Sequence, residues 1–146
     1  MSESARKSRI WPAMLVGVVY FGVGYGSAAL DPSIPDQGRF MWRLAAWIVS
    51  AAVFWSHVGY VHFRLGGSSA VTARQTALAV ALGAFLLAVA GTVHATVVAP
   101  CAPYWRFLIA LAVWPIITAV PAFLVAFAAA ATLARLSTWH PVNVHR

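Results

Sequence analysis

The chain has 146 residues, of which 62% are hydrophobic and only 9% are charged, and its formal net charge is +7. Soluble domains carry about 25% charged residues, so this composition excludes an ordinary soluble domain and indicates a membrane protein with a single domain, residues 1–146. The positive charge does not indicate nucleic-acid binding, because the basic residues stand at the ends of apolar runs, where they anchor membrane helices.

Four apolar segments follow one another along the chain. They predict helices at approximately residues 10–30, 43–64, 73–98 and 104–135, with short tails before and after them. A helix needs about 20 residues to cross the hydrocarbon layer, and every backbone group must be satisfied there within the segment. The connections are short and rich in turn residues, which makes consecutive helices antiparallel. The predicted fold class is therefore all-α: an integral membrane, up-down bundle of four transmembrane helices.

The first segment begins after a basic stretch and contains the small residues Ser27–Ala29, as a cleavable signal peptide would. Its apolar run of about 20 residues is longer than the usual core of such peptides, so we expect it to be retained as a membrane helix. Gly22 and Gly26 form a GxxxG pair within it, a pattern that allows close packing of helices inside the chain or between chains.

The second segment carries polar residues at a strict heptad spacing. Arg43, Ser50, His57 and Arg64 are each seven residues apart, and Tyr60 lies about one turn beyond His57. Residues seven apart share one helix face, and unpaired polar groups that face lipid are costly. We therefore expect this polar stripe to face the other helices or a partner chain.

The depth of His57 suggests which residues surround it. At 1.5 Å per residue it lies ~10 Å from the end of its helix at Arg64. Gly17 and Tyr20 of the first segment and Gly83 of the third are expected at a similar depth. Two interpretations stay open: the small residues allow close packing around the imidazole, or they leave a cavity for a ligand.

The third segment opens with Thr72 and Gln75, whose spacing predicts a capping box. His94 lies twenty residues beyond Arg74, about 30 Å along the helix, so its depth differs from that of His57 by ~20 Å. That separation is too large for one metal ion, and no metal site is predicted. A haem, pigment or quinone held by His57 alone remains the alternative.

The fourth segment contains Pro115 and Pro121, each of which removes a helix hydrogen bond. We expect a kinked helix here, with Thr118 donating a hydrogen bond to a nearby carbonyl. Cys101 is the only cysteine, which excludes an intramolecular disulfide.

Basic residues in the short flanks predict the orientation. Three lie on one side (Arg39, Arg43 and Arg106) and seven on the other (Arg6, Lys7, Arg9, Arg64, Arg74, Arg135 and Arg146). Both termini should therefore be cytoplasmic, and we expect the protein in a bacterial cytoplasmic (inner) membrane.

No segment contains a carboxylate, and no motif of a hydrolase, nucleotide-binding or haem-attachment site is present. The favoured function is non-catalytic: helix–helix association, either with copies of itself or as an accessory subunit of a membrane complex. One alternative is a small transporter or channel that uses the polar stripe. The other is a redox anchor with a haem, pigment or quinone at His57. The expected partners are the lipid bilayer and other membrane chains, without nucleic acid.

Overall fold

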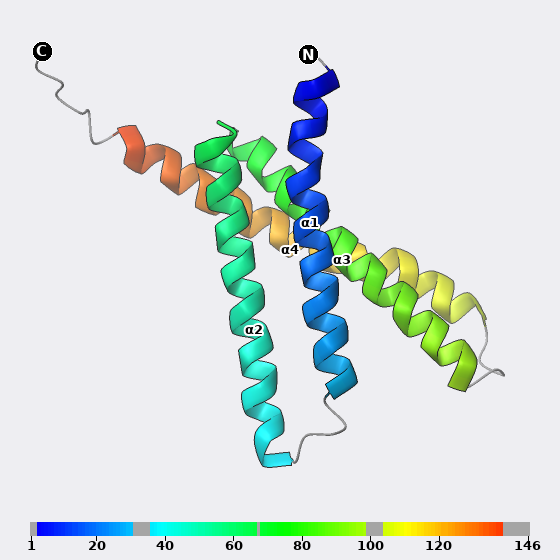
Figure 1. The fold of residues 1–146 in the computed structure, drawn as a ribbon. Coiled ribbons are helices and arrows are strands. Elements are labelled where there is room, and N and C mark those ends of the chain that lie inside the picture. The colour runs from blue at the N-terminus through cyan, green and yellow to red at the C-terminus, as the bar shows by residue number, and fades with distance from the viewer. Residues whose placement is uncertain (1–2, 31–35, 67, 99–103, 139–146) are drawn as a thin grey trace, which may run out of the picture.

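The computed structural model describes residues 3–30, 36–66, 68–98 and 104–138. These residues form four α-helices, α1 (Glu3–Leu30), α2 (Asp36–Gly59), α3 (Ser69–Val98) and α4 (Tyr104–Thr138), and a short π-helix η2 (Tyr60–Arg64) continues α2 (Figure 1). The described part of the chain is thus all-helical, as predicted. Each α-helix contains a segment long and apolar enough to cross a membrane.

Helix α3 begins at Ser69, before the predicted start at residue 73, because Ser68 caps it. The backbone N–H of Val71 donates to the Ser68 Oγ at 3.4 Å, and the N–H of Thr72 donates to the Ser68 carbonyl at 2.9 Å. The predicted capping box at Thr72 is therefore wrong, and Thr72 is fully buried inside the helix. Before the cap, Gly66 has a φ of +56°, a left-handed conformation that favours glycine and turns the chain after η2.

Helix α4 remains one continuous α-helix through Pro115 and Pro121. The Thr118 hydroxyl lies 3.0 Å from the carbonyls of both Trp114 and Pro115, so it donates to a nearby carbonyl as predicted. A hydroxyl satisfied within its own helix needs no partner on another helix, which suits a position in an apolar environment.

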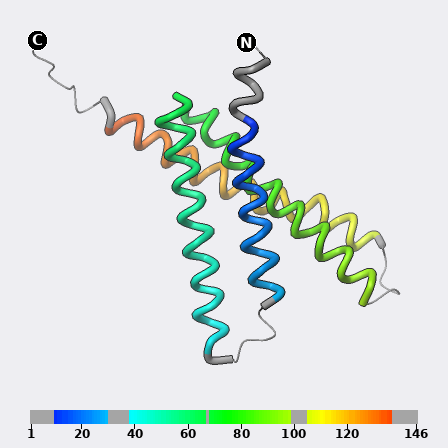
Figure 2. Tube along the Cα trace, viewed as in Figure 1, coloured from blue at the N-terminus to red at the C-terminus, as the bar shows by residue number. Residues whose placement is uncertain are grey.

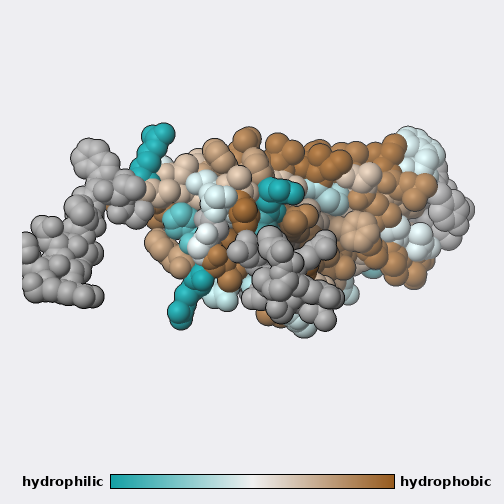
Figure 3. Space-filling model, turned by 90° about the horizontal axis from the view of Figure 1, so that it is seen from above, coloured by the Kyte–Doolittle hydropathy of each residue, from teal (hydrophilic) through white to brown (hydrophobic). Residues whose placement is uncertain are grey.

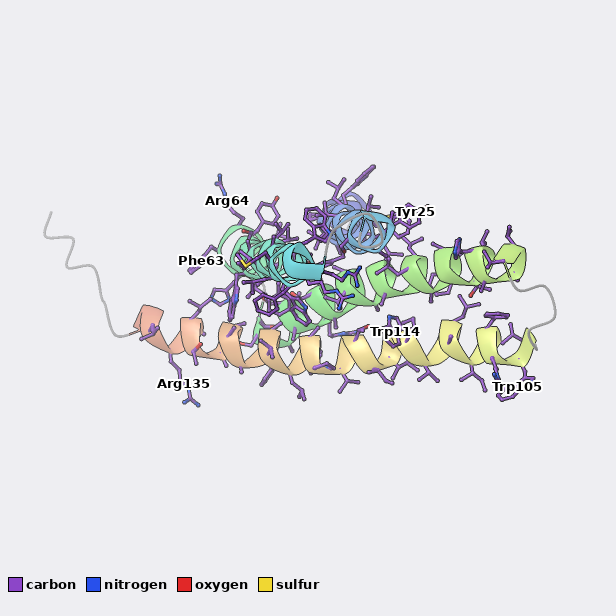
Figure 4. All side chains as sticks on the ribbon, turned by 90° about the horizontal axis from the view of Figure 1, so that it is seen from below. Tyr25, Phe63, Arg64, Trp105, Trp114 and Arg135 are labelled. Atoms are coloured by element: carbon purple, nitrogen blue, oxygen red, sulfur yellow. The ribbon has the colours of Figure 1, made fainter. Side chains whose placement is uncertain are left out.

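The helices form two hairpins (Figures 1 and 2). Helices α1 and α2 are antiparallel, as are α3 and α4, and the second hairpin crosses the first obliquely. Seen from below, α1 and α2 are viewed nearly along their axes, whereas α3 and α4 lie across the view (Figure 4). A regular up-down bundle requires four helices with nearly parallel axes. These four helices differ from that arrangement, because the two hairpins cross. Helix α3 is central: it packs most extensively on α4 and α1, and only sparsely on its sequence neighbour α2.

Two glycines explain the close crossing of α1 and α3. A methyl group added to Gly83 would lie 2.7 Å from the Tyr20 Cβ and 3.0 Å from the Gly17 carbonyl oxygen. A methyl group on Gly17 would lie 2.8 Å from the Leu82 side chain and 3.0 Å from the Ala79 carbonyl oxygen. Glycines therefore bring the two backbones together at one point, and helices that meet at small residues commonly cross at a larger angle than helices in a regular bundle.

Small side chains dominate the described interior. Its buried hydrophobic residues are mostly alanines: Ala13, Ala73, Ala79, Ala84, Ala126 and Ala130, with Val58 and Val61. Large apolar side chains lie outside instead, such as Trp47, which is 76% exposed. Figure 3 shows hydrophobic residues over most of the described surface seen from above. An interior of small residues and an apolar exterior are the opposite of a soluble fold and are typical of helices that pack in lipid.

Candidate functional site

Two hollows in the described structure contain most of the polar residues singled out from the sequence. The first, which we call the central cleft, has a volume of about 350 Å³ and is lined by residues from all four helices. It brings together Tyr20 of α1, Ser50 of α2, Gly83 of α3 and Thr118 of α4. From the sequence, Tyr20 and Gly83 are expected together at the depth of His57, while Ser50 belongs to the polar stripe and Thr118 to the proline-containing helix. Only the tertiary structure places the four around one space.

Two of the hydroxyl groups that line the central cleft are satisfied within their own helices. Ser27 lines the cleft, and its hydroxyl donates to the Val23 carbonyl at 2.6 Å, while Thr118 is bonded within α4. The Tyr20 hydroxyl differs, since it is buried and has no hydrogen-bond partner among the described residues. The cleft is therefore lined mainly by apolar residues, and the Tyr20 hydroxyl is an unused hydrogen-bonding group in its wall.

The second hollow, the α1–α2 groove, has a volume of about 410 Å³. Its walls are Pro12, Leu15 and Val16 of α1 and Ala52 and Val53 of α2. Three polar residues also line it, Ser56, His57 and Tyr60, and they lie toward the end of α2 that continues into η2. The groove therefore has an apolar end and a polar end. Ala52 and Val53 lie at the apolar end of the α2 wall, and Ser56, His57 and Tyr60 supply hydrogen-bonding groups at the polar end.

His57 is the most buried polar residue of α2, with only 3% of its surface exposed. Its ring hydrogen-bonds to the backbone of Gln75 at the start of α3, and Val58 beside it packs on Ala73 and Ala126. The Nε2 atom of the ring is buried without a hydrogen-bond partner in the part of the chain that the structure describes. A buried nitrogen without a partner costs free energy comparable to a lost hydrogen bond, so this atom calls for an explanation.

The predicted polar stripe is divided by the structure. Ser50 lines the central cleft and His57 the α1–α2 groove, whereas Arg43 and Arg64 at the two ends are exposed. Figure 4 shows Arg64 pointing away from the other helices. Tyr60 lines the groove and is also 47% exposed. The residues of the polar stripe share one face of α2, but they do not line one continuous space in the structure.

The predicted glycines also separate into two groups. Gly17, Gly83 and the Tyr20 Cβ meet at the α1–α3 crossing, which supports the packing interpretation for these positions. A methyl group on Gly22 or Gly26 would meet nothing within 4 Å. The sequence analysis missed Gly24, where a methyl group would lie 2.6 Å from the Leu87 side chain. Its spacing of seven residues from Gly17 was the available signal.

Three further polar residues near His57 were not recognised as buried from the sequence. Thr72 and Thr76 are fully buried, and the Gln75 Oε1 is buried without a hydrogen-bond partner among the described residues. The Thr76 hydroxyl donates to the backbone carbonyl of Thr72 at 2.9 Å, whereas the Thr72 hydroxyl has no hydrogen-bond partner among the described residues. Their polar character suggested a helix start, whereas the real start at Ser69 places them against the other helices.

The histidines do not converge on a metal site in the described residues. These residues contain no group of three or more His, Cys, Asp and Glu side chains suited to a metal ion. His94 is exposed on α3, and the His62 ring packs edge-on against Phe63 at 5.1 Å between centroids. Cys101, His140 and His145 lie outside the described residues.

The fold defines a class: an all-helical protein with four helices that are each long and apolar enough to cross a membrane. No family model, curated protein or solved structure matches the chain. The function must therefore be inferred from the helices and their surfaces alone.

Proposed function

We propose that this protein is an integral protein of a bacterial cytoplasmic membrane that acts by helix–helix association, with copies of itself or as an accessory subunit of a larger membrane complex. The observation that carries the proposal is the open small-residue face of α1, where Gly22 and Gly26 are four residues apart and no described residue packs on either. In lipid, such a face lets a second helix approach closely and gain van der Waals contact, as the Gly17–Gly83 crossing does within the chain.

In the proposed topology all four helices cross the bilayer, which their length and apolar composition support. Transmembrane helices tilt by up to about 40°, so two hairpins tilted in opposite directions both span it while crossing each other. Arg106 lies over the Trp105 ring at 5.5 Å at the start of α4, and Arg135 lies near the other end of the helix (Figure 4). Tryptophan and arginine are typical of membrane interfaces, and the excess of basic residues on the side of the termini makes that side cytoplasmic.

A transporter that uses the polar stripe is the less supported hypothesis. Such a path needs polar groups that line one continuous space through the protein. Ser50 and His57 line different hollows instead, and the hydroxyl of Thr118 is bonded within its own helix. The open face of α1 requires no such path and is therefore the better basis for a function.

Energy transfer between labelled copies in lipid vesicles tests self-association. Cys101 is the only cysteine, so each copy takes one donor or one acceptor dye. We expect transfer well above that of two unrelated membrane proteins at the same density. The double variant Gly22→Leu and Gly26→Leu should reduce it to that background, because leucine side chains keep a second helix at a distance. Ala28→Leu, an exposed position on another face of α1, is the matched control and should leave the transfer unchanged.

Purification from native membranes in mild detergent tests the accessory-subunit form. A stoichiometric partner that the Gly22→Leu and Gly26→Leu variant loses, and that Ala28→Leu keeps, supports the proposal. The proposal fails if the wild-type protein shows only background transfer in vesicles and also purifies from native membranes as a monomer without a partner. It fails too if Ala28→Leu abolishes association as completely as the double variant.

A further inference from the structure

We infer that the α1–α2 groove is a binding site for a membrane-soluble amphiphile with an uncharged, ring-shaped, hydrogen-bonding head, of the quinone class, and that His57 contacts that head. The inference is independent of self-association, because it concerns a hollow within one chain, and the α1 residues that line it, Pro12, Leu15 and Val16, precede Gly22 and Gly26 along the helix.

The dimensions of the groove suit a small molecule. Ligand sites in proteins commonly have volumes of about 300–1,000 Å³ and are mainly apolar with a few placed polar groups. The groove has a volume of about 410 Å³, and five of its eight lining residues are apolar. A ring with a short isoprenoid tail is of this size, and its tail would lie along the apolar residues Leu15, Val16 and Val53.

The polar end of the groove carries hydrogen-bonding groups without charge. Ser56, His57 and Tyr60 line this end, and no lining side chain among those described is an acid, a lysine or an arginine. An anionic phospholipid head would require a cation in the groove, since a buried charge must be paired. An uncharged head with carbonyl or hydroxyl oxygens needs only the hydroxyls and the imidazole. The lining therefore favours a quinone over a charged lipid.

The state of the His57 ring supplies an independent observation. A neutral imidazole has one donor nitrogen and one acceptor nitrogen. The backbone of Gln75 satisfies one of these groups, while Nε2 is buried and unpartnered among the described residues. A ligand head that binds at the His57 ring would give Nε2 the hydrogen-bond partner that the described residues do not provide. The cost of that unmade bond is regained on binding, which is typical of binding sites.

The backbone changes from an α-helix to a π-helix near His57, at the polar end of the groove. The π-helix η2 begins at Tyr60, immediately after the turn that carries His57. A π-turn commonly ends an α-helix, and its wider turn changes the direction of the side chains that it carries. Here it falls at the polar end of the groove, where Tyr60 is both the first residue of η2 and a lining residue.

Ubiquinone-1 tests the inference with the full-length protein in mild detergent. Trp11 and Trp55 are each adjacent in sequence to a lining residue, so their fluorescence reports a quinone in the groove. We expect saturable quenching by ubiquinone-1. In Ala52→Phe the phenyl ring occupies part of the groove, so the ligand loses contacts there. We expect the dissociation constant to rise by about tenfold or more. Ala51→Phe is the matched control, since Ala51 is exposed beside Ala52 but does not line the groove.

Variants of His57 test the head-group contact. His57→Leu should also weaken binding by about tenfold, whereas His57→Gln, which keeps hydrogen-bonding groups, should retain most of the affinity. Far-UV circular dichroism and gel filtration establish that each variant is folded. If His57→Leu does not fold, the pair Ala52→Phe and Ala51→Phe still decides whether the groove binds the quinone.

Four results overturn the inference. They are unsaturable quenching of the wild-type protein, an equal loss of affinity in Ala51→Phe and Ala52→Phe, unchanged affinity in folded His57→Leu, and displacement of ubiquinone-1 by phosphatidylglycerol, which would make the groove a phospholipid site.

Discussion

Two faces of α1 each carry a pair of glycines, but among the described residues another helix packs against only one of these faces. On one face, Gly17 and Gly24 leave no room for a methyl group, because α3 lies against them. On the other, Gly22 and Gly26 have open space. The comparison shows that a glycine in a membrane helix is not by itself a sign of close packing. What matters is whether a neighbouring backbone actually lies against it.

Substitution at the crossing should produce the largest effect. Gly83→Val places a branched side chain where even a methyl group lies 2.7 Å from the Tyr20 Cβ and 3.0 Å from a backbone oxygen. Because that backbone cannot rotate away, we expect the free energy of unfolding to fall by about 3 kcal/mol, the upper range for overpacking. Titration of the folded protein with SDS, followed by circular dichroism, measures the change. A loss below about 0.5 kcal/mol would mean that the α1–α3 crossing is not close.

Gly24→Ala should have a smaller effect at the same interface. The added methyl group meets the end of the Leu87 side chain at 2.6 Å and not a backbone atom. A flexible side chain rotates to another rotamer, so we expect a loss of about 1 kcal/mol in the same SDS titration. A loss as large as that of Gly83→Val would show that Leu87 is locked in place by its other neighbours.

Gly22→Ala and Gly26→Ala should not destabilise the fold of the single chain. No atom lies within 4 Å of either added methyl group, and alanine is a better helix former than glycine by about 1 kcal/mol in soluble hosts. We expect an unchanged or slightly higher free energy of unfolding in the SDS titration, measured at protein concentrations where copies do not associate. Destabilisation comparable to that of Gly24→Ala would contradict the distinction between the two faces.

The candidate site could be predicted only in part. The heptad spacing predicted that the polar groups of α2 avoid lipid; Ser50 and His57 line hollows between helices, whereas Arg43 and Arg64 are exposed. The spacing could not divide Ser50 and His57 between two hollows, since that depends on how α2 is rotated and on which helix packs against it. The capping signal at Thr72 failed for a related reason: threonine occurs both as a helix cap and inside helices, and Thr72 is fully buried inside α3 because Ser68 caps the helix instead.

The sequence by itself determined the number and the helical character of the apolar segments. Long apolar runs leave no other way to satisfy the backbone hydrogen bonds in lipid, and this requirement is local to each segment. The tertiary structure alone decided that the two hairpins cross at Gly17 and Gly83 and that His57 is buried beside an apolar groove. Those features depend on the shapes of surfaces that meet from distant parts of the chain. In lipid, where apolar residues on every face are equally well solvated, shape and not hydrophobicity selects the contact.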